Sequence, residues 1–130
     1  MPSLFTRILR GELPGYTLFE DDLVFAILAR DAIQPGHTLV IPRAEIDHFA
    51  DVPDPAYTRV YAVAKRLAPA IKAASGCVRV GQIVVGLEVP HFHLHLVPLF
   101  DASDIDFKKG RVRPPAEMAA MQTAITAAIG

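Results

Sequence analysis

Apolar positions follow two different periods along this chain, and the change of period divides it into strands and helices. Short alternating or unbroken apolar runs are typical of β-strands, whereas apolar residues three or four positions apart mark one face of a helix. Five strands are predicted, at Tyr16–Glu20, Val24–Leu28, His37–Ile41, Cys77–Val85 and His91–Val97. Three helices are predicted: a short one after Ser3, a long one capped by Asp54 and closed at Ser75-Gly76, and one over Pro115–Ile129.

Short turns join most of these elements. Pro35-Gly36 separates two strands, and Gly86–Pro90 connects the last two strands most simply as a hairpin. Because short connections favour antiparallel neighbours, we expect an α+β fold, with a mainly antiparallel five-stranded sheet, a long helix and terminal helices. The segment Asp101–Pro115 shows no periodicity and is predicted to be a polar loop. No repeat or linker interrupts the chain, so residues 1–130 are expected to form a single domain.

Composition and charge exclude several classes of protein. Hydrophobic residues make up 52% of the chain and charged residues 21%, which is typical of a globular protein and not of a disordered one. The net charge of −1 gives no electrostatic reason to expect nucleic acid or an anionic membrane as a partner. Cys77 is the only cysteine, which excludes an intrachain disulfide. With no secretory signal pattern and no long apolar run, a cytoplasmic location is expected.

Three of the five histidines stand at alternate positions in the last predicted strand, at His91, His93 and His95. Side chains on a strand alternate between its two faces, so the three imidazoles are predicted to share one face while Phe92 and the leucines enter the core. Pro98 has no amide hydrogen and is expected to end the pairing of this strand. Three histidines in strict alternation, in a chain that has only five, indicate a functional site.

Two kinds of chemistry suit such a row. Imidazole is the commonest metal ligand, but residues two apart on a strand are about 6.6 Å apart, so His91 and His95 are too distant to bind one ion around His93. At most one adjacent pair would share a metal, and no cysteine or carboxylate cluster supplies the other ligands. The second kind is direct attack by a histidine on phosphorus, with its neighbours holding the phosphate oxygens. We favour the second and expect no metal site.

The motif and its surroundings resemble a known family. The run His91–Val97 fits the pattern His-apolar-His-apolar-His-apolar-apolar that names the histidine-triad (HIT) superfamily. The resemblance extends over roughly residues 3–98, whereas the loop and helix of residues 99–130 carry little family information. The other matching segments are Ser3–Phe5, Arg10–Pro14, Phe19–Asp22, Pro35–Pro42 and Gly86–Pro90.

The resemblance implies a nucleotide-binding hydrolase or transferase that acts at the α-phosphate of an AMP or GMP conjugate. It implies that His93 is the nucleophile and forms a nucleotidyl-histidine intermediate, which water then cleaves. His91 and His95 would orient His93 and hold the phosphate, and His37 would be a fourth, supporting histidine. The resemblance also implies a homodimer and a chemical step that needs no metal or other cofactor.

The chain departs from the family pattern at two kinds of position. Relatives often carry two cysteines in the first helix and a histidine after the third strand as zinc ligands. This chain has Ser3, Thr6 and Glu45 there, so a structural zinc is not expected.

The second kind of departure is at positions that contact the nucleotide in relatives. The acid that holds the ribose hydroxyls in relatives falls at Ala29, and Asp31 is the candidate substitute. A Gln-Ser pair before the triad is replaced by Leu87-Glu88, so Glu88 is the candidate group beside the leaving group. Gln82, on the strand beside the triad, either bonds a phosphate oxygen or is a solvent-facing polar residue. These departures motivate an alternative function, a non-catalytic nucleotide-binding or scaffolding dimer.

Overall fold

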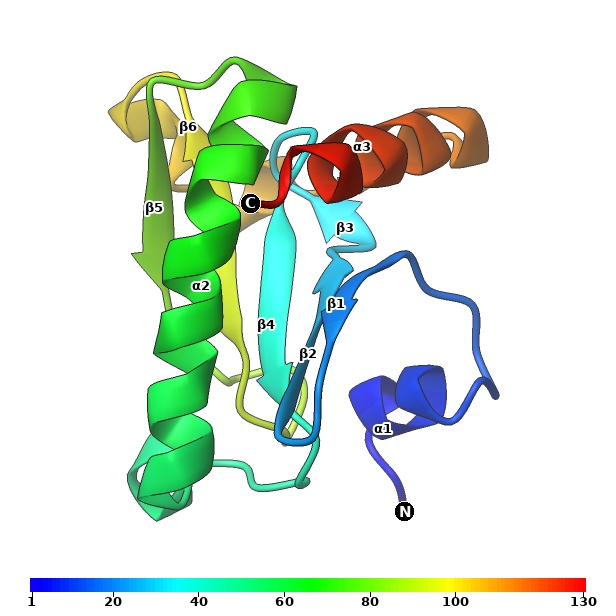
Figure 1. The fold of residues 1–130 in the computed structure, drawn as a ribbon, viewed down its shortest axis with the longest axis vertical. Coiled ribbons are helices and arrows are strands. Elements are labelled where there is room, and N and C mark those ends of the chain that lie inside the picture. Colours follow the sequence, from blue (N-terminus) through cyan, green and yellow to red (C-terminus); the bar gives the residue numbers. More distant parts are fainter.

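Five strands form one antiparallel sheet in the computed structural model, which describes residues 1–130 (Figure 1). The strands lie in the order β1-β2-β4-β6-β5, and every neighbouring pair is antiparallel. The expected α+β fold with a five-stranded sheet is therefore confirmed. The strands of this sheet are β1 (Thr17–Glu20), β2 (Val24–Leu28), β4 (Thr38–Pro42), β5 (Arg79–Ile83) and β6 (Leu94–Leu99).

The long helix α2 (Asp54–Ser75) covers one face of the sheet (Figure 1). It begins one residue earlier than predicted, because Pro53 occupies the capping position, and it ends at Gly76, whose φ of 72° is left-handed. Val60, Leu67 and Ile71 are completely buried against the sheet, and each contributes about 1.5–3 kcal/mol of hydrophobic stabilisation. The last helix, α3 (Pro115–Ala128), adds Met118 and Ile125 to the same core. None of the helices combines the length and apolar character needed to span a bilayer.

The opposite face of the sheet carries a smaller apolar cluster under the first helix, α1 (Leu4–Leu9). Phe5 from α1 packs there with Ile27, Leu39 and Ile41 from β2 and β4. Ser3 caps α1 by accepting a hydrogen bond from the Thr6 amide at 3.1 Å. The N-terminal helix thus lies on the face that α2 leaves open.

Strand β6 differs from its predicted extent at both ends. It begins at Leu94, because the β4 register would place Pro42 opposite Phe92, and Pro42 has no N–H to donate. The Phe92 amide donates to the Ile46 carbonyl instead. The expectation that Pro98 ends the pairing is wrong, since Val80 pairs with Pro98 and Arg79 with Leu99.

The reason lies in the direction of the Pro98 nitrogen. The Leu99 carbonyl accepts from the Val78 amide on the β5 side, so the neighbouring Pro98 backbone points to the β4 side. The pairing between β4 and β6 has already ended at Leu96. No ladder hydrogen bond is therefore lost at Pro98.

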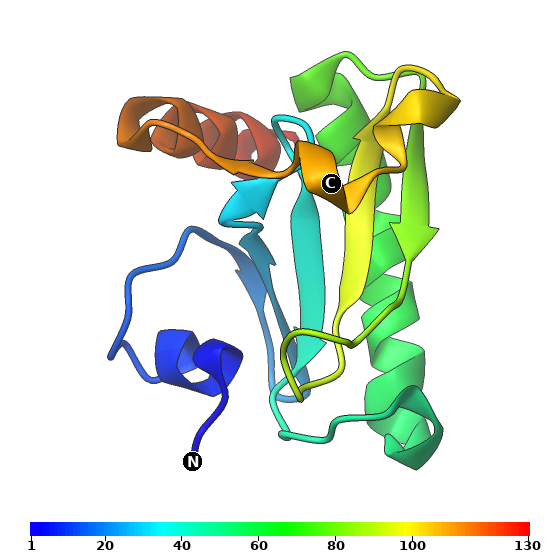
Figure 2. The same cartoon turned by 180° about the vertical axis from the view of Figure 1, so that it is seen from behind.

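The segment predicted as a polar loop has short elements of its own. Two 3-10 turns, Ala102–Asp104 (η2) and Phe107–Lys109 (η3), precede the two-residue strand β7 (Arg111–Val112). Strand β7 pairs with β3 (Asp31–Ala32) as a small second sheet. Figure 2 shows this segment crossing in front of β4 and β6, on the face opposite α2. The C-terminal segment therefore lies on the same face as the histidines.

Candidate active site

The histidines of the motif form a continuous row of rings on the face opposite α2. The His93 and His95 ring centroids are 4.8 Å apart, and the Phe5 ring lies edge-on to both His91 and His93, at 5.7 and 4.8 Å. His95 stands opposite Leu39 of the small apolar cluster, whereas Leu94 and Leu96 enter the core under α2. The predicted alternation of faces is confirmed, although only His95 lies within the strand.

His91 is held from both sides of its ring. Its Nε2 lies 2.7 Å from the Pro42 carbonyl oxygen, which can only accept, so Nε2 carries the hydrogen. In a neutral ring Nδ1 is then an acceptor, and the Ser3 hydroxyl donates to it at 2.6 Å. His91 is completely buried, so its position and tautomer are determined by Ser3 and the end of β4.

His93 has the opposite tautomer. Its Nδ1 lies 2.7 Å from the His91 carbonyl oxygen and must donate to it. The Nε2 atom of the neutral ring therefore carries a free lone pair. An imidazole nitrogen held in this way is suited to nucleophilic attack.

His37 and His95 form a directed pair. The Ile33 amide donates to His37 Nδ1 at 3.0 Å, so the His37 hydrogen is on Nε2. His37 Nε2 lies 3.0 Å from His95 Nδ1 and donates to it. The hydrogen of His95 is consequently on Nε2, where it is available to a bound group. The row thus presents a lone pair on His93 next to a donor on His95.

Burial keeps these rings neutral. Desolvation, together with a smaller effect of the neighbouring histidines, lowers the pKa of His37 to about 4 and that of His95 to about 3. Burial also lowers the pKa of His91 and His93 below the ordinary value of 6.5. The charge of Glu88 opposes this effect at His93 and raises its pKa. At neutral pH the four imidazoles are therefore uncharged. His93 can attack with its Nε2 lone pair, and the other rings can donate hydrogen bonds from a neutral N–H.

The three predicted substrate-binding residues are placed differently. Glu88 is exposed and close enough to His93 for its charge to act on that ring. Gln82 pairs with Leu96, whose side chain faces α2, so Gln82 is on the opposite face from His93 and His95. Asp31 is exposed in β3, opposite Val112. Of the three, only Glu88 is seen to act on the pKa of His93, and Gln82 lies on the other face of the sheet.

Ser3, Thr6 and Glu45 meet as a hydrogen-bond network. Glu45 Oε1 accepts from the Ser3 amide at 2.6 Å and from the Thr6 hydroxyl at 2.7 Å. These hydrogen bonds lower the pKa of Glu45, the Ser3 amide having the largest effect. Zinc sites in proteins use thiolate, imidazole and carboxylate ligands, and the two hydroxyls here are already hydrogen-bonded. The residues do not fit zinc, and hydrogen bonds join the start of α1 to Glu45, three residues after β4, and to His91 instead.

A cavity of about 680 Å³ opens beside His93. It lies between the first turns of α2 and residues 84–87, which follow β5, and Phe49, Tyr57, Tyr61 and Phe92 contribute aromatic walls. This volume is within the range of small-molecule sites, which are mostly apolar with a few polar groups. Of the four histidines of the site, only His93 lines this cavity.

Two residues of the C-terminal segment belong to the site and were not predicted. The Phe107 ring lies edge-on to His95 with centroids 4.9 Å apart. Arg113 lines a small pocket with His37 and donates to the carbonyls of Ala32 and Ile33. The sequence marks Arg113 only as one of a small basic cluster in this segment, for which a solvated loop is favoured over a phosphate contact. An aperiodic segment gives no indication of where it crosses the sheet, so the sequence does not show that Phe107 meets His95.

Comparisons with known proteins agree with this geometry. Residues 10–102 match the HIT domain. A HIT-like protein of Borreliella burgdorferi whose activity is uncharacterised is 34% identical over 114 residues, which are 82% of each chain. Adenosine 5′-monophosphoramidase HNT1 of Saccharomyces cerevisiae is 32% identical over 99 residues, covering 75% of this chain and 63% of the yeast protein.

Comparison of the fold with solved structures indicates the same family. The crystal structure of a Hit-like protein from Bartonella henselae, described as involved in cell-cycle regulation, superimposes with a TM-score of 0.86. The two chains are 25% identical, and the match covers 97% of this chain and 95% of the other. With the motif, the sheet and the sequence match in agreement, this chain belongs to the HIT family of nucleotide-binding proteins.

Proposed function

We propose that this protein hydrolyses nucleoside monophosphate conjugates at the α-phosphate, with His93 as the nucleophile. One observation carries the proposal: His93 Nδ1 donates to the His91 carbonyl, which leaves the Nε2 lone pair free beside the donor of His95. The yeast relative is named as an adenosine 5′-monophosphoramidase, an activity of this reaction class.

The reaction runs in two displacements. His93 Nε2 attacks the α-phosphorus, the bond from phosphorus to the leaving group breaks, and a nucleotidyl-histidine forms. The phosphate oxygens accept from His95 Nε2–H, whose direction is set by His37. Water then attacks the same phosphorus, the bond to His93 breaks, and the nucleoside monophosphate leaves. No metal or other cofactor takes part in either step.

Glu88 is proposed to face the leaving group. This proposal is supported by its exposure and by the effect of its charge on His93. A protonated carboxyl there would give the departing amine or oxygen a proton, whereas a carboxylate would repel a polyphosphate. We therefore expect Glu88→Gln to favour anionic leaving groups over amines, measured as the ratio of kcat/KM for the two substrate types. An unchanged ratio would remove Glu88 from the mechanism.

The test of the proposal is hydrolysis of adenosine 5′-phosphoramidate in the presence of EDTA. We expect AMP release by the wild-type protein and none above background by His93→Ala. Wild-type protein mixed with substrate and quenched in alkaline denaturant, in which the P–N bond is stable, should carry one added nucleotidyl group, located on His93 by mass spectrometry. Circular dichroism and urea denaturation show whether His93→Ala is folded. Equal turnover by a folded His93→Ala protein would refute the mechanism.

A second function, binding of nucleotides without turnover, is favoured by the missing ribose acid. Ala29 occupies that position and is buried in the apolar cluster beneath α1, so it offers no hydrogen-bonding side chain. Asp31 would have to substitute from the exposed strand β3. Thermal stabilisation by AMP without product from any conjugate would support this second function.

We also propose that the protein is a cytoplasmic homodimer. Strand β5 is at the edge of the sheet and has β6 as its only neighbour, so its outer side is open to pairing. Val78, Val85 and Leu87, at 68%, 48% and 88% exposure, make this edge apolar. Light scattering should give twice the mass of 14.1 kDa for the wild-type protein. Val85→Lys is expected to shift it toward the monomer.

A further inference from the structure

Arg113 has a buried side chain and lies outside residues 10–102, which match the HIT domain. It follows β7 and precedes α3, and only 9% of its side-chain surface is exposed. Its Nε has no hydrogen-bond partner, and its nearest acid, Glu117, is 3.7 Å away and 43% exposed. Burying a guanidinium with incomplete compensation destabilises a fold. Such a residue calls for a role other than stability.

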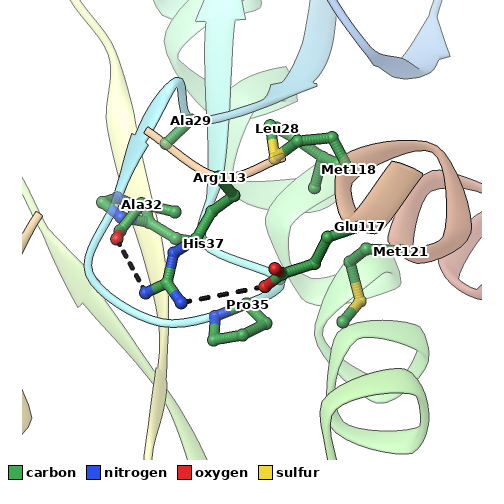
Figure 3. Close-up of a pocket in the computed structure, with 10 residues that line it drawn as sticks. Leu28, Ala29, Ala32, Pro35, His37, Arg113, Glu117, Met118 and Met121 are labelled. Atoms are coloured by element: carbon green, nitrogen blue, oxygen red, sulfur yellow. Dashed lines mark hydrogen bonds and ion pairs between the residues drawn. The ribbon is translucent and has the colours of Figure 1, made fainter. Parts of the chain in front are cut away.

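The hydrogen bonds of Arg113 lead to the histidine row. Its Nη2 donates to the carbonyls of Ala32 and Ile33, at 3.1 and 3.2 Å. Figure 3 shows the guanidinium between Ala32 and Glu117, beside His37. The amide of the same Ile33 donates to His37 Nδ1, and His37 Nε2 donates to His95 Nδ1. Arg113 therefore holds the peptide units that set the tautomer of His37.

We propose that Arg113 is a positioning residue for the active site: it fixes the loop before His37, and through His37 it keeps the Nε2–H of His95 directed at the substrate. The proposal rests on the proposed function for its kinetic consequence. It gives the C-terminal segment, which lies beyond residue 102 and outside the matched domain, a part in the reaction.

Arg113 also closes the space around His37. The pocket that they share is only about 10 Å³, and its other walls are mostly apolar. His93 and His95 interact electrostatically with His37, and Arg113 and Glu117 are the charged residues that line the pocket with it. Removing the Arg113 side chain would admit water to this space. Because burial is the main cause of the low pKa of His37, hydration of the ring favours the charged imidazolium and raises that pKa.

The experiment compares Arg113→Ala with the wild-type protein by NMR titration of the imidazoles and by steady-state kinetics. We expect the pKa of His37 to rise from about 4 toward 6.5, with His95 following. His91 should not move, because Ser3 and Pro42 hold it at the other end of the row. We expect kcat/KM to fall about tenfold to a hundredfold, the effect of misplacing a group in the site.

Arg111→Ala is the matched control, since this exposed arginine lies two residues away and has no ion-pair partner within 4 Å. It should retain the wild-type titration and kcat/KM. If Arg113→Ala does not fold, Arg113→Lys replaces it, because lysine keeps the charge but lacks the planar fork that reaches both carbonyls. Arg113→Lys should then show the raised His37 pKa and the lowered kcat/KM.

Two results would overturn the proposal. One is a folded Arg113 variant in which His37 titrates as in the wild-type protein. The other is an equal shift of all the histidines, which would mean a general loosening of the fold. The titration does not require turnover, so absence of hydrolysis in every protein would refute the proposed function and leave this test intact.

Discussion

The buried histidines should make the fold unstable in mild acid. His37 is 2% exposed, and burial lowers its pKa to about 4, whereas an unfolded chain titrates near 6.5. Between these values the unfolded chain binds a proton that the folded chain does not, so the free energy of unfolding falls as the pH falls. The gap of about 2.5 pH units corresponds to about 3 kcal/mol, a large part of the 5–15 kcal/mol typical of a domain.

Urea denaturation at intervals from pH 8 to pH 4 measures this dependence. We expect the free energy of unfolding to be nearly constant above pH 7 and to fall by about 1.4 kcal/mol per pH unit for each such histidine below pH 6. His95 adds to the effect, since burial lowers its pKa to about 3. Carboxylates affect the free energy of unfolding in a lower pH range. Glu45 and Asp104 have pKa values lowered by backbone hydrogen bonds, so their contribution is lost only below about pH 4.5.

The variant His37→Gln isolates the contribution of one ring. Its amide can still donate to His95 but does not titrate, so the stability of this variant should depend less steeply on pH. The comparison uses the slope of the free energy of unfolding against pH, so a loss of stability that is the same at every pH does not affect it. His48→Gln, at an exposed loop position, is the matched control. A wild-type stability that is equal at pH 7 and pH 4.5, or a His37→Gln slope equal to that of the wild-type protein, would refute the reasoning.

Three further predictions concern stability and local order. Ser3→Ala removes the donor to the buried His91 Nδ1 and the cap of α1, so we expect a loss of about 1–3 kcal/mol in urea denaturation, more than for Thr6→Ala. Leu67→Ala, in the core under α2, should cost about 2–5 kcal/mol, against less than about 0.5 kcal/mol for the exposed Lys65→Ala; equal losses would contradict the assigned core. Gly110→Ala would place a Cβ 2.6 Å from the Asp31 carbonyl oxygen, so amide exchange should quicken in β3 and β7 and stay unchanged in β6.

Periodic features were the ones that the sequence predicted well. The helices α2 and α3 and the strands of the large sheet agree with their predicted positions to within a few residues, because burial on one face imposes a regular spacing on apolar residues. The histidine row was predicted for the same reason. Its alternation survives even where His91 and His93 leave the ladder.

Features that depend on register or on distant segments were missed. The pattern of β5 indicates which residues share a face but not which face meets the histidines. The sequence therefore left open whether Gln82 bonds a phosphate oxygen, and the structure places it on the face away from the histidines. The role of Pro98 depends on which neighbour its nitrogen faces. Strands of two residues have no period, so neither β3 nor β7 was predicted. The buried position of Arg113, directly after β7, was missed for the same reason.

The small ladder between β3 and β7 has a consequence for the dynamics of the site. It pairs two residues with two, and strand pairs of this size are marginal on their own. Segments with little buried surface open locally, at a lower free energy than unfolding of the whole domain. Phe107 rests on His95 just before this ladder. The histidine row therefore lies between two parts that differ in the free energy of opening. We expect the large sheet to open only when the domain unfolds, and the segment that covers His95 to open locally while the rest of the domain stays folded.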